Sequence, residues 1–200
     1  MIKKIHYICW LMYVQPLSHI ACIIAVLVLF WSLLGFYANR YDTTRRLWIG
    51  FNICVLTISS IVILYLTILN RLDMESMKGI ERLSLQRELI LVPFHSFQKA
   101  RTQPEIYRSM LMNIYLFVPW GLSFPLTLSG KLYSKACAVL TVIVALLFSI
   151  SVEALQYYMG IGQSEVDDVL MNSLGCLIGA MSIIIANCIN NWWKAKRNED

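Results

Sequence analysis

The feature that most constrains this chain is a series of apolar runs, each long enough to cross a lipid bilayer. A helix needs about 20 largely apolar residues to span roughly 30 Å of hydrocarbon. Five runs meet this requirement, namely residues 17–37, 48–69, 110–128, 136–159 and 166–189. None of them shows the period-two alternation of a β-barrel strand. We therefore expect an all-α fold, a polytopic transmembrane helical bundle of about five spans.

The composition supports a membrane protein. Hydrophobic residues make up 58% of the 200 residues and charged residues only 14%, which is too apolar for a soluble domain of this length. The net charge of +5 then relates to orientation in the membrane. We expect membrane lipids as partners and no nucleic acid. The six cysteines show no CxxC or Cys/His spacing, so we interpret them as small apolar residues and expect no metal and no cofactor.

The distribution of basic residues predicts an orientation. With five spans, the basic loops 40–46 and 131–135 and the basic C-terminal tail fall on one side, which would be the cytoplasmic side. The turn 160–167 has no Lys or Arg and would face outward. The connector 70–108 and the N-terminal Lys3 and Lys4 argue the other way. We favour a multi-pass membrane protein with its N-terminus outside and its C-terminus inside.

Three regions are predicted along the chain. Residues 1–47 hold an interfacial segment (5–14) and an extra transmembrane helix, residues 48–190 form the main membrane domain, and residues 191–200 are a basic and then polar tail. Within the main domain, residues 71–87 are typical of a surface helix. Residues 89–97 are too apolar for a solvated loop, and the proline at 93 favours an extended backbone before it. We expect this segment to pack on the bundle or dip into the bilayer.

Two adjacent spans carry polar stripes. A carboxylate in or beside a transmembrane helix is costly, so by default it marks a candidate functional site. If the two spans form a helical hairpin, the stripes can face each other, and glycines in one stripe allow close approach of the backbones. At helical spacing, the stripes consist of Ser149, Glu153 and Gln156 on one span, and Asp168, Asn172, Gly175 and Gly179 on the next.

Three stretches, in this order, resemble the VanZ family of bacterial membrane proteins. They are Leu91-Val-Pro-Phe94, Asn113-Ile-Tyr-Leu-Phe-Val-Pro-Trp-Gly121, and Glu153-x-x-Gln156 followed by Asp167-Asp168-x-x-x-Asn172-x-x-Gly175. The likeness covers roughly the last two-thirds of the chain. Glu165 stands where the family has an acid, whereas Gly162-Gln163 stands where some members have an arginine. The family is named for low-level resistance to teicoplanin-type glycopeptides. The resemblance implies structural roles for Pro93, Phe94, Pro119, Gly121 and Gly175. Gly175 and Gly179 also form a GxxxG pair, which indicates close helix packing.

The polar residues allow several interpretations. Glu153 and Gln156 suit a buried hydrogen-bonded pair that fixes helix register, with Asn113 or Asn172 as partner, and Glu153 equally suits a site for a proton, a cation or a polar headgroup. Ser164 to Asp167 matches a capping box. Asp168 suits a hard cation or general acid/base chemistry. The candidate polar cluster comprises Asn113, Glu153, Gln156, Asp167, Asp168 and Asn172. A catalytic role for His95 and Ser96 is disfavoured, because no nucleophile motif surrounds them.

Three hypotheses of function follow. The first is a VanZ-like envelope protein whose outward-facing cluster, roofed by residues 89–97, engages a lipid-linked envelope intermediate, another amphiphile or a glycopeptide, and so lowers susceptibility to teicoplanin-type drugs. The second is an intramembrane enzyme acting on a lipid-linked or cell-wall intermediate, with the candidate catalytic residues Glu153 and Asp168 as acid and base. The third is a small transporter.

Overall fold

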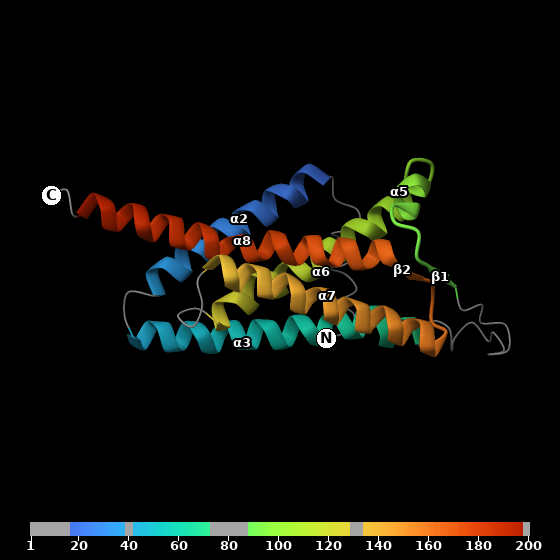
Figure 1. Cartoon of the computed structure of the whole chain (residues 1–200), viewed down its shortest axis with the longest axis horizontal. Coiled ribbons are helices and arrows are strands. Elements are labelled where there is room, and N and C mark those ends of the chain that lie inside the picture. The colour runs from blue at the N-terminus through green and yellow to red at the C-terminus, as the bar shows by residue number, and fades with distance from the viewer. Residues whose placement is uncertain (1–16, 39–41, 73–87, 129–133, 198–200) are drawn as a thin grey trace.

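The computed structural model describes residues 17–38, 42–72, 88–128 and 134–197. The predictions for residues 5–14 and for most of the surface helix at 71–87 lie outside these ranges. Five long helices run roughly along one axis (Figure 1). They are α2 (Leu17–Ala38), α3 (Asp42–Leu64) with the π-helical turn η1 (Tyr65–Leu69), α6 (Pro104–Thr127), α7 (Ser134–Met159) and α8 (Val166–Arg197). The short elements are β1 (Leu89–Ile90), α5 (His95–Ala100) and β2 (Ser164–Glu165).

The predicted fold class is confirmed. Within the described ranges, five helices are long and apolar enough, by length and composition, to cross a membrane. Three of them extend by several residues beyond the predicted spans. α3 begins at Asp42, ahead of the predicted start at residue 48. α6 begins at Pro104, because Gln103 is extended and proline at the first helical position needs no hydrogen-bond acceptor for its nitrogen. α8 continues to Arg197, and its last turn carries Lys194, Lys196 and Arg197, which suit the negative end of the helix dipole.

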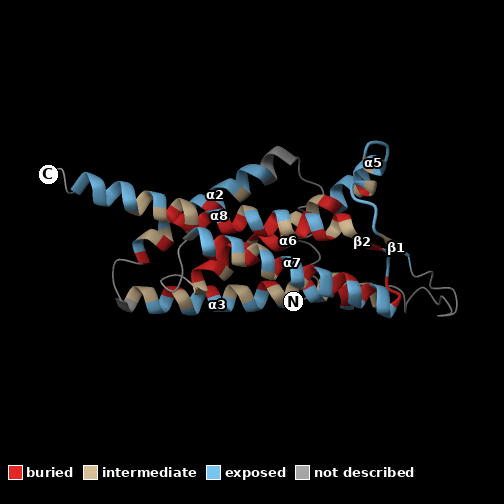
Figure 2. Ribbon diagram, in the orientation of Figure 1, coloured by how far each residue is buried: buried red, intermediate tan, exposed pale blue. Residues whose placement is uncertain are grey.

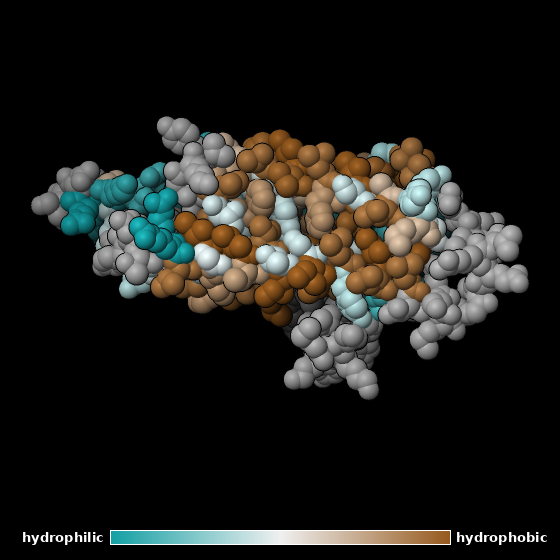
Figure 3. Space-filling view, turned by 90° about the horizontal axis from the view of Figure 1, so that it is seen from below, coloured by the Kyte–Doolittle hydropathy of each residue, from teal (hydrophilic) through white to brown (hydrophobic). Residues whose placement is uncertain are grey.

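α6 and α8 form the centre of the bundle. In each of these two helices 56% of the apolar, membrane-spanning stretch is buried inside the protein. The corresponding share is 17–28% in α2, α3 and α7. Buried residues accordingly follow these two helices through the middle of the molecule (Figure 2). α2, α3 and α7 surround this pair and turn many large apolar side chains outward. Figure 3 shows one face on which apolar residues cover most of the length of the bundle, as expected for a lipid-facing surface.

Three glycines bring the backbones of α6 and α8 together. A Cβ added to Gly175 would lie 2.1 Å from the carbonyl oxygen of Ile114, and one added to Gly121 would lie 2.2 Å from that of Cys176. At Gly179 the carbonyl oxygen of Val118 would be 2.4 Å away. The glycines were expected to face the preceding span, α7, but they meet α6 instead. The helix period fixes which residues share a face, but it does not say which neighbour covers that face.

Polar and aromatic contacts attach α3 to its neighbours. The indole nitrogen of Trp120 on α6 donates to the hydroxyl of Ser60 on α3 at 3.1 Å. The indole nitrogen of Trp31 on α2 donates to the buried side-chain oxygen of Asn52 at 2.9 Å, and the Asn52 amide donates to the Trp48 carbonyl at 2.7 Å. These bonds use side-chain polar groups that would otherwise be unpaired in an apolar environment.

Candidate functional site

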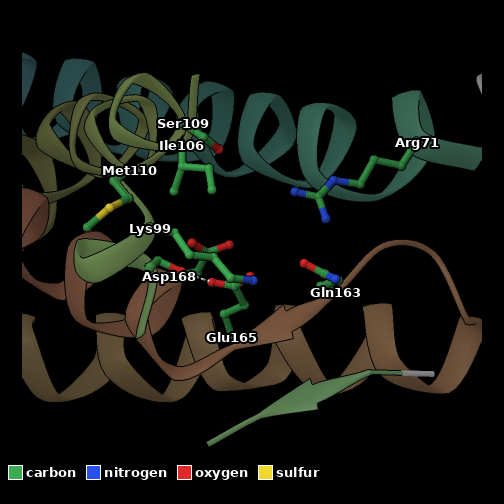
Figure 4. Close-up of a pocket in the computed structure, with 9 residues that line it drawn as sticks. Arg71, Lys99, Ile106, Ser109, Met110, Gln163, Glu165 and Asp168 are labelled. Atoms are coloured by element: carbon green, nitrogen blue, oxygen red, sulfur yellow. Dashed lines mark hydrogen bonds between the residues drawn. The ribbon is translucent and has the colours of Figure 1, made fainter. Parts of the chain in front are cut away.

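Several segments that are distant in sequence meet at one end of the bundle. They are the end of α3, the β1–α5 segment, the start of α6, and the turn between α7 and α8 with β2 (Figure 1). This end contains a pocket of about 250 Å³, with charged groups of both signs in its wall (Figure 4). The lining residues are Arg71, Ser96, Lys99, Ile106, Ser109, Met110, Gln163, Glu165 and Asp168.

Asp167 holds the β1–α5 segment in place. Its carboxylate is 1% exposed and accepts two backbone hydrogen bonds of 2.7 Å, from the N–H of Phe94 and from the N–H of Ser96. Phe94 has a φ of 64°, a left-handed conformation that is unfavourable for a residue with a bulky side chain. The two bonds to Asp167 stabilise this turn and the start of α5. Asp167 thus fixes a segment more than 70 residues earlier in the chain.

The capping-box interpretation of Ser164 and Asp167 is wrong. The Ser164 hydroxyl donates to the carbonyl oxygen of Glu153 at 2.8 Å, so its bond is to the end of α7 rather than to the first turn of α8. The Asp167 carboxylate is occupied by Phe94 and Ser96. Both side chains have the residue types and spacing of a local motif, but long-range partners bind them instead.

The β1 and β2 strands add a second connection. Leu89 pairs with Ser164 in a short parallel ladder, and the Ser164 N–H donates to the Glu88 carbonyl at 3.1 Å. The Ser96 hydroxyl donates to the Glu165 carboxylate. The backbone of residues 89–97 is therefore extended only at its start, and it becomes helical from His95 onward. As a result, Ser96 and Lys99 of α5 reach the pocket.

Glu153 supports the turn rather than lining the pocket. It is 8% exposed, and its Oε2 accepts the backbone N–H of Glu165 at 3.2 Å. The turn itself contains Gly160 and Gly162, with φ values of 67° and 81° that favour glycine. Asp168 is an electrostatic neighbour of Glu153, but of the two only Asp168 lines the pocket.

Gln156 contacts the π-helical turn η1. Its side-chain nitrogen donates to the backbone carbonyl of Thr67 at 3.0 Å. A π-helical turn is wider than an α-helical one and often occurs at functional sites. An extra residue in a helix rotates the residues that follow by about 100°. We infer that Gln156, which is 1% exposed, stabilises the wide turn and so sets the direction of Arg71 just beyond it.

Arg71 and Lys99 are the charged pocket residues that the sequence analysis missed. A Cβ added to Gly162 would lie 2.7 Å from an Nη atom of Arg71, so the guanidinium lies directly against the α7–α8 turn. In Figure 4 it enters the pocket from the short helical stretch that follows η1, on the side of Gln163. It interacts electrostatically with Glu153 and Asp168. The available signal for Arg71 was a basic residue at the end of an apolar span, opposite a turn without Lys or Arg.

The remaining candidates lie deeper in the bundle. The Asn172 amide donates to the Ser149 hydroxyl at 2.8 Å, so the polar stripes of α7 and α8 do meet at this level. Asn113 of α6 is a side-chain neighbour of Asp168.

His95 is not among the residues that line the pocket. Within the described residues, no group of three or more His, Cys, Asp or Glu side chains is arranged to hold a metal ion.

The comparisons with known proteins agree with the resemblance in the motifs. A family model described as VanZ/LLP1 matches residues 20–187, which include all five long helices in whole or in large part. No curated protein and no solved structure matches the chain.

Proposed function

Because the chain belongs to the VanZ/LLP1 family, we propose that it is a protein of the bacterial cell envelope whose end pocket binds the polar head of a lipid-linked or other amphiphilic ligand. The observation that supports this most is the pocket of about 250 Å³ at the helix ends, with Arg71, Lys99, Glu165 and Asp168 in its wall. Charged side chains of both signs at the end of a transmembrane bundle can form charge-assisted hydrogen bonds with the polar head of an amphiphile.

The exposed side chains of the β1–α5 segment support the same proposal. Leu91, Val92 and Phe94 are 66%, 63% and 59% exposed, although each is apolar. At the end of a transmembrane bundle, such side chains are expected to insert between lipid headgroups and acyl chains. The pocket would then open beside the lipid interface, where the head of an amphiphile is available.

We place the pocket on the outer side of the membrane, with the N-terminus outside and the C-terminus inside. The far end of the bundle carries Arg45 and Arg46 of α3 and the basic last turn of α8, as expected for a cytoplasmic face. In intact cells, a cysteine introduced at the exposed Gln163 is expected to react with a membrane-impermeant maleimide. If the cysteine reacts only after the cells are permeabilised, the pocket faces the cytoplasm and the proposed orientation is wrong.

If the ligand is an envelope component that glycopeptides also encounter, expression of the protein lowers susceptibility to teicoplanin. We expect Asp168→Asn to return susceptibility to the empty-vector level, because Asp168 lines the pocket. Glu153→Gln is expected to have a smaller effect, since Glu153 mainly supports the turn. Minimal inhibitory concentrations at matched membrane levels of the protein provide the measurement.

The matched control is Glu105→Gln, which removes an exposed carboxylate from the first turn of α6, outside the pocket lining. It should behave as the parent. If Asp168→Asn and the parent protect cells equally, the pocket has no part in the phenotype.

A second candidate function is an intramembrane enzyme that acts on a lipid-linked intermediate. The electrostatic proximity of Glu153 and Asp168 favours it, because paired carboxylates can act as general acid and base. Purified protein would then turn over a labelled lipid intermediate with a bell-shaped pH profile. If the protein binds lipid-linked envelope intermediates but turns over none of them, the enzymatic function is excluded and only the binding function stands.

A further inference from the structure

The acids at the pocket end differ in whether the protein itself occupies them. Asp167 accepts two backbone N–H groups, Glu165 accepts the Ser96 hydroxyl, and Glu153 accepts the Glu165 N–H. Asp168 has a different environment. Its side chain lines the pocket, and its neighbours are charged groups and the Asn113 amide. Asp168 is thus the acid that a ligand cation can approach.

The two cations of the pocket are also available to a ligand. Among the described residues, neither Arg71 nor Lys99 forms an ion pair with a carboxylate within 4.0 Å. Figure 4 shows that Arg71 enters from the short helical stretch that follows η1, beside Gln163, whereas Lys99 lies near Glu165 and Asp168. The pocket therefore has a cationic side at Arg71, where the neighbouring Gln163 amide already donates to the exposed carboxylate of Glu88, which lies outside the pocket lining. The opposite side has two acids, Glu165 and Asp168, and the single positive charge of Lys99 neutralises only part of their negative charge.

This separation of charge suits a ligand that carries both signs. We propose that the pocket selects a zwitterionic phospholipid headgroup of the phosphoethanolamine type, with the phosphate at Arg71 and the ammonium at Asp168. A guanidinium provides several donors for phosphate oxygens, and a carboxylate accepts from a primary ammonium. A volume of about 250 Å³ has room for roughly eight waters, which is enough for a small headgroup.

Gln156 has a positioning role in this site. It does not line the pocket, but its bond to the Thr67 carbonyl lies in the wide turn directly before Arg71. Loss of this bond should let the turn relax and move the guanidinium away from Gly162. Gln156→Ala is therefore expected to weaken phosphate binding without changing the preference between headgroups. Because this effect acts through Arg71, Gln156→Ala should weaken retention no further in a protein that already carries Arg71→Gln, whereas a general loss of stability would weaken it further.

The inference rests on the proposed function and is tested by lipid selectivity. The full-length protein is purified, and its retention of phosphatidylethanolamine, phosphatidylglycerol and phosphatidylcholine is measured by native mass spectrometry after exchange into vesicles of each lipid. A charge-assisted hydrogen bond to Asp168 should favour phosphatidylethanolamine over phosphatidylglycerol by about tenfold. Phosphatidylcholine should bind more weakly than phosphatidylethanolamine, because its quaternary ammonium cannot donate a hydrogen bond.

The variants separate the two halves of the site. Asp168→Asn should remove the preference for phosphatidylethanolamine over phosphatidylglycerol, and Arg71→Gln should weaken retention of all three lipids by about tenfold while keeping the preference. Glu105→Gln is the charge-matched control and should change neither. Asp168→Glu, which keeps the carboxylate, should retain the preference and so separates charge from folding.

Each contrary result has a defined meaning. Equal retention of phosphatidylethanolamine and phosphatidylglycerol by the unmodified protein would overturn the headgroup assignment and leave amphiphile binding intact. Retention of no lipid would overturn both the headgroup assignment and the proposed binding of amphiphiles. Displacement of bound lipid by equimolar water-soluble phosphoethanolamine would show that the ligand is a soluble compound and would overturn the lipid assignment, whereas resistance to displacement supports it.

Discussion

Gly175→Ala is expected to prevent normal packing of the two central helices. The added Cβ would lie 2.1 Å from the carbonyl oxygen of Ile114 and 2.8 Å from its carbonyl carbon. These are backbone atoms of α6, so no side-chain rotation can relieve the clash, and the helices must separate. Overpacking of this kind costs about 3 kcal/mol, and separation of α6 from α8 would also disturb the pocket that both helices line.

Thermal unfolding of the purified protein in a mild detergent measures this effect, with the yield of folded protein in membranes as a second readout. The matched control is Gly50→Ala in α3, where an added Cβ meets no atom within 4 Å. Alanine is the better helix former by about 1 kcal/mol, so the control should be as stable as the parent or slightly more stable. Equal stability of the two variants would contradict the close contact between α6 and α8.

Asp167→Ala is expected to release the β1–α5 segment from the bundle. The substitution leaves the N–H groups of Phe94 and Ser96 without their acceptor and removes the support of the left-handed turn at Phe94. Two hydrogen bonds to a buried charge contribute on the order of 3 kcal/mol. Because Ser96 and Lys99 reach the pocket through this segment, ligand binding should be lost together with local stability.

Hydrogen exchange detects this release directly. The amides of Phe94 and Ser96 should be protected in the parent protein and should exchange rapidly in Asp167→Ala, while the amides of α6 and α8 stay protected. Asp168→Asn, one residue further on, is the control, because no backbone amide in the described residues depends on Asp168. Unchanged protection of Phe94 and Ser96 in Asp167→Ala would mean that other contacts hold the segment.

The helices of this protein could be predicted from the sequence because their determinants are local. Runs of apolar residues of membrane-spanning length indicate where each span lies, whatever its neighbours are. The glycine pair at 175 and 179 likewise predicted a close helix contact. Its partner could not be predicted, since α6 is separated from α8 in the chain by the whole of α7, and a periodic pattern carries no information about which helix lies opposite.

The site was less accessible to sequence reasoning for two physical reasons. Ser164 and Asp167 have the spacing of a local capping motif, and only the folded structure shows that Glu153, Phe94 and Ser96 bind them instead. Arg71 depends on the wide turn at Tyr65–Leu69, which has no recognisable sequence signal and which Gln156 stabilises from another helix. Both cases are long-range contacts that replace a local preference.

The account depends most on one geometric claim, that the end of α3 and the α7–α8 turn face the same pocket. It is tested by Arg71→Cys with Gln163→Cys in a protein whose Cys9, Cys22, Cys54 and Cys188 are replaced by alanine, treated with a thiol cross-linker about as long as an arginine side chain. We predict a cross-linked peptide pair within one chain, and none for Arg71→Cys with Lys194→Cys. If both cysteines react singly with a maleimide but the first pair does not cross-link, the pocket is not assembled as described.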